Sequence, residues 1–259
     1  MRIKILGVAI DTYSFHEAQK QARNFFRDGK QHIIVTPNPE FLLLARRDKE
    51  FHQILNQADL SLPDGVGLIF ASYFLRQPIE ERITGVSFVH VICDEAERAS
   101  LSVFLLGSEE TVVKKAAERL QKEYPRLRIA GIKSGGVIEL RIKNDELGIM
   151  DRWRYEDTGV LDTIRQAKPD ILFVALGQGK QEKWIADNLQ SFPSIKIAMG
   201  VGGALDYIAG AASWAPAWVR IIGLEWLWRL IHNPWRWRRI LNAVIMFPLV
   251  VIYEKIFGE

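Results

Sequence analysis

The chain has 259 residues, of which 48% are hydrophobic and 25% charged, with a formal net charge of +3. This composition excludes a disordered chain, and the length suffices for one large α/β domain or two modest domains. The single cysteine, Cys93, excludes an internal disulfide framework, and the N-terminus lacks a signal-peptide pattern, so we expect a cytoplasmic protein.

Seven apolar segments in the first 206 residues predict β-strands. Several are continuous runs of Val, Ile and Leu without polar alternation, which is typical of strands buried on both faces. The predicted strands cover residues 3–8, 32–36, 58–62, 102–107, 127–132, 170–177 and 196–202. Helical patterns lie between them, so the order of elements predicts a Rossmann-like α/β domain with a mostly parallel sheet flanked by helices. The polar segment 133–157 shows neither the apolar repeat of a helix nor that of a strand and is interpreted as an insertion.

Three helix starts are readable in the sequence. Ser14 and Glu17 have the spacing of a capping box. Asn38 is expected to cap a helix whose first residue is Pro39. Ser108 is predicted to begin the helix that follows the fourth strand.

Polar side chains and glycines follow four of the predicted strands. Ligands of open parallel sheets bind beyond the carboxyl ends of the strands, so we predict that these residues line one pocket. Thr36 ends the second predicted strand and Asn38 follows it, and Asp64 follows the third within a Pro-Asp-Gly sequence. The ends of the last two predicted strands and the loops after them supply the predicted substrate-binding residues Gly177, Gln178, Gln181, Gly200, Gly202, Gly203 and Asp206.

Each of these features also has a purely structural interpretation, which the sequence leaves open. Asn38 is a good helix cap, Pro-Asp-Gly is a common turn around Asp64, and glycines let strands turn into helices. The sequence contains no GxGxxG, Walker A, GxSxG, HExxH or CxxC motif, and its histidines are scattered. We therefore predict no metal site and no cofactor, and the missing dinucleotide fingerprint argues against an oxidoreductase.

The segment 207–259 differs in composition from the rest of the chain. Between Tyr207 and Tyr253 there are five arginines and one acid, together with six of the eight tryptophans. A nucleic-acid-binding protein would more often carry lysine-rich patches on its folded body, so we predict no nucleic-acid partner. For residues 235–252, interleaved Arg and Trp are instead typical of a helix that lies on an anionic membrane surface, whereas the tryptophans and leucines of 214–231 leave packing on the main sheet open. The predicted membrane contacts are Trp235, Trp237, Arg238 and Phe247.

The apolar run Ile240–Tyr253 is too short for a membrane span. Its fourteen residues would rise ~21 Å as a helix, against an apolar bilayer core of ~30 Å. Asn242 and Pro248 are expected to weaken the helix further. We therefore predict an anchor that lies on the membrane without crossing it.

Taken in order, the motifs of this chain resemble those of the WecG/TagA/CpsF glycosyltransferases of bacterial cell-surface polysaccharide synthesis. The resemblance covers roughly residues 30–239 and rests on "TPNPEFLLLARRD", "ADLSLPDGVGL", "RITGVSF", "FLLGSEE", "YPRLRIAGI", "PDILFVALGQGKQEKWI", "GVGGALDYIAG" and "GLEWLWRLIHNPWRWRR". It implies an inverting transfer of a hexose, often N-acetylmannosamine or a related sugar, from a UDP-sugar to a sugar on undecaprenyl diphosphate.

The resemblance also implies roles for individual residues. Asp64 corresponds to the catalytic base of the family, and Thr36 belongs to the same catalytic site. Asn38, Arg82 and Gln181 match positions that line the family's pocket. The family's C-terminal arginines, thought to reach the diphosphates, correspond to Arg220, Arg229, Arg236 and Arg239.

The sequence lacks the Asp-x-Asp pair with which many sugar transferases hold a divalent cation. We therefore expect a metal-independent enzyme in which arginines and helix N-termini neutralise the diphosphate. Four departures from the family pattern leave the donor sugar open, and two of them are the insertion over 133–157 and the apolar extension after Arg239. Ser213–Trp214 replaces a basic pair, and "GQGKQE" stands where the family often has GxPRQE.

The expected organisation is a catalytic domain over 1–206 and an Arg- and Trp-rich helical appendage over 207–259. The expected partners are a UDP-sugar donor, a polyprenyl-diphosphate-linked acceptor and the anionic inner face of the bacterial plasma membrane. The sequence leaves open a homo-oligomer. The alternative function is a non-catalytic, peripheral membrane adaptor that binds a nucleotide.

Overall fold

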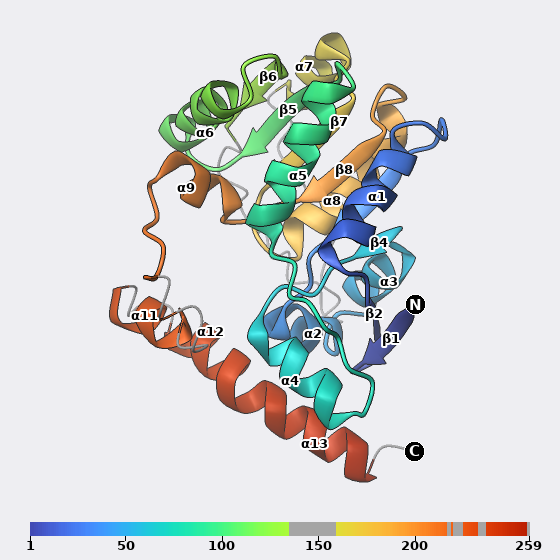
Figure 1. The fold of residues 1–259 in the computed structure, drawn as a ribbon, viewed down its shortest axis with the longest axis vertical. Helices are drawn as coiled ribbons and strands as arrows, with labels where there is room; N and C mark the ends of the chain where they lie inside the picture. Colours follow the sequence, from blue (N-terminus) through green and yellow to red (C-terminus); the bar gives the residue numbers. More distant parts are fainter. Residues whose placement is uncertain (135–158, 217–218, 220–224, 233–236, 258–259) are drawn as a thin grey trace, which may run out of the picture.

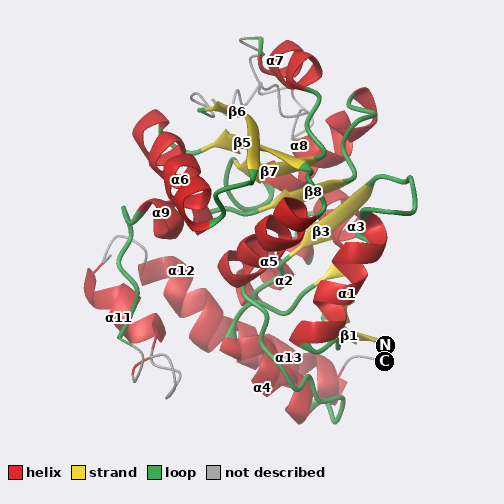
Figure 2. Cartoon of the chain, turned by 45° about the horizontal axis from the view of Figure 1, so that its top comes forward, coloured by secondary structure: helices red, strands yellow, loops and turns green. Residues whose placement is uncertain are grey.

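The computed structural model describes residues 1–134, 159–216, 219, 225–232 and 237–257. Its centre is a six-stranded sheet with the strand order β4-β3-β8-β7-β5-β6, in which every pair is parallel (Figures 1 and 2). The strands are β3 (His32–Val35), β4 (Leu60–Ser61), β5 (Ser102–Gly107), β6 (Arg128–Lys133), β7 (Ile171–Ala175) and β8 (Ile197–Gly200). The predicted α/β fold with a parallel sheet is therefore confirmed.

Helices cover both faces of this sheet, which explains the uninterrupted apolar runs in the strands. Along β5, Val103 and Leu105 pack into the core on one face, whereas Phe104 and Leu106 pack into the core on the other. The helices on the first face are α1 (Phe15–Phe25), α5 (Gly85–Arg98), α6 (Glu110–Glu123) and α9 (Ala204–Ala209). The other side carries α2 (Pro39–Ala45), α3 (Lys49–Gln57), α7 (Val160–Ala167) and α8 (Lys180–Asn188).

The N-terminal segment forms a separate hairpin. The single strand predicted over 3–8 was wrong, because the chain reverses within it: β1 (Arg2–Ile5) and β2 (Val8–Asp11) pair in antiparallel fashion. Leu6 has φ 50° and Gly7 has φ 77°, the positive values that a type I′ hairpin turn requires. Leucine rarely adopts such a φ, so the sequence pattern did not indicate the turn.

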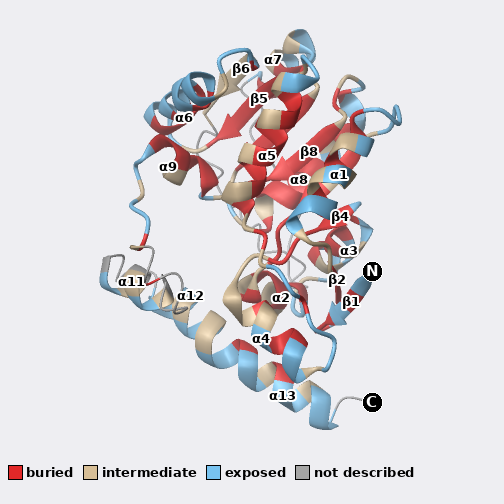
Figure 3. Ribbon diagram, in the orientation of Figure 1, coloured by how far each residue is buried: buried red, intermediate tan, exposed pale blue. Residues whose placement is uncertain are grey.

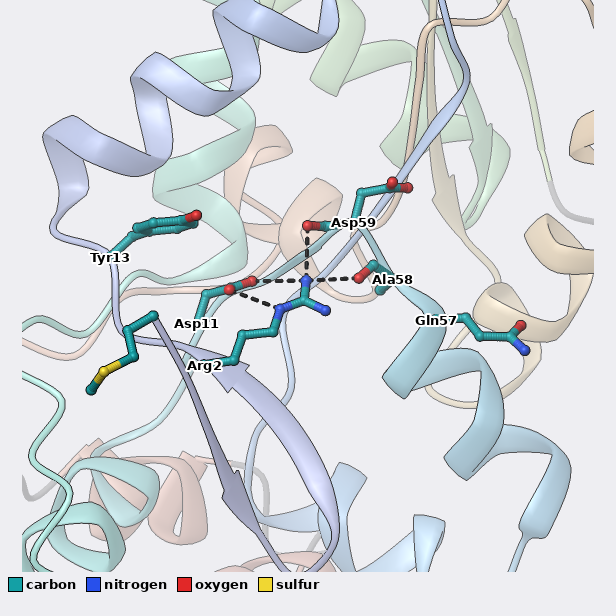
Figure 4. Close-up of a pocket in the computed structure, with 7 residues that line it drawn as sticks. Arg2, Asp11, Tyr13, Gln57, Ala58 and Asp59 are labelled. Atoms are coloured by element: carbon teal, nitrogen blue, oxygen red, sulfur yellow. Dashed lines mark hydrogen bonds and ion pairs between the residues drawn. The ribbon is translucent and has the colours of Figure 1, made fainter.

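An ion pair within this hairpin, between Arg2 and Asp11, also bonds to the backbone beside β4, next to a surface hollow of about 460 Å³ (Figure 4). The Arg2 guanidinium donates to both carboxylate oxygens of Asp11, at 2.9 and 3.1 Å, and to the carbonyls of Ala58 and Asp59, each at 2.8 Å. Asp11 in turn accepts the backbone N–H of Ser61 at 2.8 Å. Because these bonds join the hairpin to the end of α3 and to β4, we assign this hollow a structural role.

Two of the predicted helix starts are confirmed. The hydroxyl of Ser14 accepts the N–H of Glu17 at 3.3 Å, while the Glu17 carboxylate accepts the N–H of Ser14 at 2.8 Å. Oδ1 of Asn38 accepts the N–H groups of Glu40 and Phe41 at 3.0 and 3.1 Å. From residue 135 on, the insertion predicted over 133–157 lies outside the described residues.

The C-terminal helix is longer than the sequence suggested. The segments α12 (Trp237–Leu241), a π-helical turn (Asn242–Met246) and α13 (Phe247–Phe257) follow one another without a break. They form one apolar helix of 21 residues, which would rise ~31 Å. By length and composition alone it can cross a membrane, so the length argument against a span was wrong.

Asn242 and Pro248 do not interrupt this helix because the backbone changes its hydrogen-bond pattern between them. The N–H of Phe247 bonds to the carbonyl of Asn242, five residues earlier. Pro248 has no N–H to offer the next carbonyl, and the wider π turn before it accommodates this loss.

The long helix runs along the body of the protein beside α4 (Val66–Phe74) and α2, with much of its surface exposed (Figures 1 and 3). The prediction that Phe247 contacts a membrane was wrong. Its side chain is only 1% exposed and packs, with Val251, into the core formed by α2, α3 and α4. Phe247 therefore docks the helix on the body.

Candidate functional site

A cleft of about 1090 Å³ lies beyond the carboxyl ends of the central strands. It brings together residues that follow β3, β4, β5, β7 and β8, although these loops are far apart in the sequence. The residues predicted for catalysis, substrate binding or diphosphate binding that line it are Thr36, Asn38, Asp64, Arg82, Gly177, Gln178, Gln181, Gly200, Gly202, Gly203, Asp206 and Arg239. The prediction of one shared pocket is confirmed, and the chemical roles of these residues stay predictions.

Asp64 is held by two backbone groups, one from the loop after β3 and one from the start of α5. Its N–H donates to the carbonyl of Pro37 at 2.8 Å, and its Oδ2 accepts the N–H of Gly85 at 3.1 Å. Gly85 is the first residue of α5, where the helix dipole favours a negative charge. The carboxylate is thereby fixed in orientation within the cleft.

Gly85 also explains how Thr36 and Asp64 come together. A Cβ atom on Gly85 would lie 3.1 Å from Oγ1 of Thr36 and 3.8 Å from Oδ2 of Asp64. The missing side chain therefore lets the helix start approach both polar groups. The analysis of the sequence did not single out Gly85, although it lies within the "RITGVSF" motif.

A buried pair of polar side chains joins two of the cleft loops. Gln181 is 2% exposed, accepts the N–H of Gly202 at 2.9 Å and donates to Glu182 at 2.7 Å. Glu182 also accepts the N–H of Gly179 at 2.8 Å. A Cβ atom on Gly200 would lie 2.6 Å from Glu182 Oε1, so glycine is needed there. Gln181 thus shapes the cleft, and the unpredicted Glu182 supports it.

Burial raises the pKa of the Glu182 carboxyl to about 7, although hydrogen bonds from Gln181 and the Gly179 N–H oppose this shift. The folded protein therefore holds this proton more tightly than the unfolded chain. This group makes the free energy of unfolding fall as the pH rises from about 4.5 to about 7. We expect Glu182→Gln to remove this contribution, up to roughly 3 kcal/mol across that window.

Chemical denaturation at several pH values between 4.5 and 8 measures this slope. The matched change Glu118→Gln, at an exposed position on α6, should leave it unchanged. An equal slope in the wild type and in Glu182→Gln would contradict the assignment.

Ser108 does not begin a helix, contrary to the prediction. Gly107 and Ser108 have φ values of 106° and 60°, so the chain leaves β5 in a left-handed conformation, and α6 begins two residues later. The Ser108 hydroxyl instead donates to Oδ1 of Asp206 at 3.3 Å. A Cβ atom on Gly107 would lie 2.4 Å from the carbonyl oxygen of Ala175, which accounts for glycine there.

Arg239 connects the C-terminal helix to the cleft. Its guanidinium donates to both carboxylate oxygens of Glu40, at 2.9 and 3.0 Å, and to Oε1 of Gln178 at 2.9 Å. Glu40 lies in the first turn of α2, and Gln178 follows β7. Arg239 therefore lies at the rim of the cleft, between the appendage and the body.

The structure describes only some of the other C-terminal residues that were predicted to contact diphosphate or membrane. Arg220, Trp235 and Arg236 lie outside the described residues, and Arg229 lies on α11 (Glu225–His232) with its side chain outside the description. Trp237 and Arg238 are exposed, and the Arg238 guanidinium lies 5.3 Å from the centroid of the Trp237 ring.

Two observations concern metal ligands and nucleophiles in the described part of the chain. Within it, no group of three or more His, Cys, Asp or Glu residues is arranged to hold a metal ion. Cys93 is buried, which raises the pKa of its thiol well above the usual range and makes it a poor nucleophile.

The sequence matches a family and several curated relatives. The family described as "Glycosyl transferase WecG/TagA/CpsF family" matches residues 3–259. A protein of Bacillus subtilis (strain 168) is 33% identical over 223 residues, covering 86% of this chain and 80% of the relative. One of Staphylococcus aureus (strain MW2) is 33% identical over 258 residues, covering 98% and 93%. Both relatives are named N-acetylglucosaminyldiphosphoundecaprenol N-acetyl-beta-D-mannosaminyltransferase.

Proposed function

Because this chain belongs to the WecG/TagA/CpsF family of glycosyltransferases, we propose that it transfers N-acetylmannosamine or a related hexose from a UDP-sugar to N-acetylglucosamine on a polyprenyl diphosphate. The names of the relatives supply the acceptor and the sugar. The family membership favours this enzyme over the non-catalytic adaptor. The observation that carries the proposal is the cleft itself, where Thr36 and Asp64 lie together with an arginine of the appendage.

The proposed reaction is a single inverting displacement. Asp64 takes the proton from the acceptor hydroxyl as its oxygen attacks the anomeric carbon, and UDP leaves on the opposite face. Thr36 lies beside this carboxylate and is positioned to bind the reacting sugars. The charge on the departing UDP needs stabilisation, and Arg82, Lys180 and Arg239 are the cations among the described residues of the cleft.

Metal independence is part of the proposal. The purified enzyme should keep its activity in excess EDTA, because arginines and helix N-termini supply the positive charge. Loss of activity in EDTA, with recovery on adding a divalent cation, would contradict this part alone.

We expect Arg239 to contribute to turnover as well as to the contact between the C-terminal helix and the body. We expect Arg239→Gln to lower kcat/KM for the lipid-linked acceptor by roughly tenfold, the loss of one charged hydrogen-bonding group. Initial rates in detergent micelles test this without a membrane. The neighbouring Arg238→Gln removes the same charge outside the cleft and should have little effect there. Equal losses in the two variants would contradict a role of Arg239 in the cleft.

We further propose that the enzyme is peripheral on the inner face of the bacterial plasma membrane. The relatives' names contain a lipid-linked acceptor, and the long C-terminal helix exposes apolar side chains along much of its length. In this arrangement residues 1–206 form the catalytic domain. Residues 207–259 form an appendage that reaches the membrane and completes the cleft.

Assay of the purified full chain tests the proposed function. UDP release and product formation are measured with UDP-N-acetylmannosamine and N-acetylglucosamine on a polyprenyl diphosphate, and a panel of other UDP-sugars replaces the donor in parallel. Transfer that requires the lipid-linked acceptor supports the proposal. No transfer from any UDP-sugar, with folded protein and an intact acceptor, would refute it.

A further inference from the structure

The cleft has two chemically different parts. Beyond the strand ends it is lined by polar and charged groups, among them Asp64, Arg82 and Arg239. Its other walls are α4 and the long C-terminal helix after Arg239. Every described residue that these two walls contribute is apolar. The cleft therefore changes from a polar end to an apolar end along its length.

The apolar end is a groove between two helices. α4 contributes Phe70, Ala71 and Phe74, and the C-terminal helix contributes Val244 and Ile252, among others. The two helices are in contact, and Figures 1 and 2 show them side by side. Together they form an apolar surface that is continuous with the polar site.

Gly67 and Phe247 hold the two helices together at the base of this groove. A Cβ atom on Gly67 would lie 2.8 Å from Cγ of Pro39 and 3.8 Å from Cδ1 of Phe247. The small residue thus permits close approach of α4, α2 and the C-terminal helix. At the far end, Lys255 lies over the Phe74 ring, 4.1 Å from its centroid, and donates to the Phe74 carbonyl.

The groove opens at the molecular surface through exposed apolar side chains. Phe70 lines the cleft and is nevertheless 70% exposed, and Phe74 and Ile252 are also exposed. From Arg239 to Ile252 the helix rises ~20 Å, so the apolar wall extends well beyond the polar end. A water-filled groove with such walls is unfavourable, and an apolar chain that fills it is stabilised by the hydrophobic effect.

We propose that this groove binds the polyprenyl chain of the acceptor, with the diphosphate at Arg239 and the first isoprene units between α4 and the C-terminal helix. This inference rests on the proposed function, which supplies an acceptor that carries a charged group and an apolar chain. A nucleotide-sugar alone would occupy only the polar end. The cleft volume of about 1090 Å³ lies just above the range of ~300–1,000 Å³ usual for small ligands, as a longer ligand requires.

Chain-length dependence in detergent micelles tests the groove. Two acceptors with the same sugar and diphosphate are compared, one with a single isoprene unit and one with a long polyprenyl chain. We expect the wild type to have a KM for the long-chain acceptor lower by on the order of tenfold. The double variant Phe70→Ser/Ile252→Ser should lose this preference, because its KM for the long-chain acceptor rises toward that for the short-chain acceptor.

The matched control is Tyr73→Ser. Tyr73 lies on the same helix as Phe70 and is 59% exposed, but it does not line the cleft. This control should keep the wild-type preference. The inference is overturned if the wild type shows no preference for the long chain, or if the double variant and the control lose it equally, which would indicate general contact with the micelle or with lipid.

A binding measurement separates this inference from the proposed function. A polyprenyl diphosphate with a photoreactive group on its second isoprene unit should cross-link to α4 and to the C-terminal helix, identified by mass spectrometry of the peptides. Cross-links confined to other elements would overturn the proposal that the groove binds the polyprenyl chain, even if transfer is observed. Absence of transfer with either acceptor in the wild type would instead refute the function on which the groove rests.

Discussion

Replacing Asp64 with Asn is expected to lower kcat by roughly 10²- to 10⁴-fold, the contribution typical of a positioned general base. The amide has the shape of the carboxylate, and its oxygen can still accept the Gly85 N–H that holds Asp64 at 3.1 Å. It cannot take a proton from the acceptor hydroxyl. The geometry of the cleft should therefore persist while proton transfer is lost.

The measurement combines initial rates of transfer with UDP binding by titration calorimetry. UDP affinity should be roughly unchanged, because the variant loses an interaction made in the transition state. Glu109→Gln is the matched control, since Glu109 lines the same cleft and loses the same charge. Near-normal turnover in Asp64→Asn, or an equal loss in Glu109→Gln, would refute Asp64 as the base.

Leu249→Asp/Ile256→Asp is expected to release the enzyme from anionic vesicles, lowering its partition coefficient on the order of 100-fold. Leu249 and Ile256 are 56% and 63% exposed and lie seven residues apart, so they share one face of the C-terminal helix. Each substitution removes an aliphatic side chain that would be buried in lipid, and it adds a carboxylate that the anionic surface repels.

Co-sedimentation with phosphatidylglycerol-containing vesicles measures this loss. The fold should survive, because Phe247 and Val251, which dock the helix, are unchanged. Thr111→Asp/Gln121→Asp adds the same charge to exposed positions of α6, and this control should still sediment with the vesicles. Wild-type sedimentation of the Leu249→Asp/Ile256→Asp variant would contradict the proposed membrane contact.

The location of the cleft could be predicted from the sequence because it depends on the sheet. Continuous apolar runs indicated strands buried on both faces, and a parallel sheet brings the carboxyl ends of all its strands to one edge. Thr36, which ends the second predicted strand, and Asp64, which follows the third, therefore had to lie near each other. The order of the motifs then identified the family, which the comparison over residues 3–259 confirmed.

The sequence did not predict which residues pack against one another. Glu182 was not singled out in the sequence, yet it is buried and supports two loops of the cleft. Phe247 looked like part of a membrane anchor, yet it fills the core beside α4. Apolar or polar character indicates whether a residue tolerates burial, and only the assembled structure decides what covers it.

The sequence by itself determined the α/β fold, the edge of the sheet where the cleft lies and the family, because these follow from local patterns and motif order. Only the tertiary structure decided that the C-terminal helix runs unbroken along the body and forms one wall of the cleft. Arg239 and Glu40, 199 residues apart, meet across that wall. No local pattern specifies such a contact, since it depends on how α2, α4 and the C-terminal helix pack together.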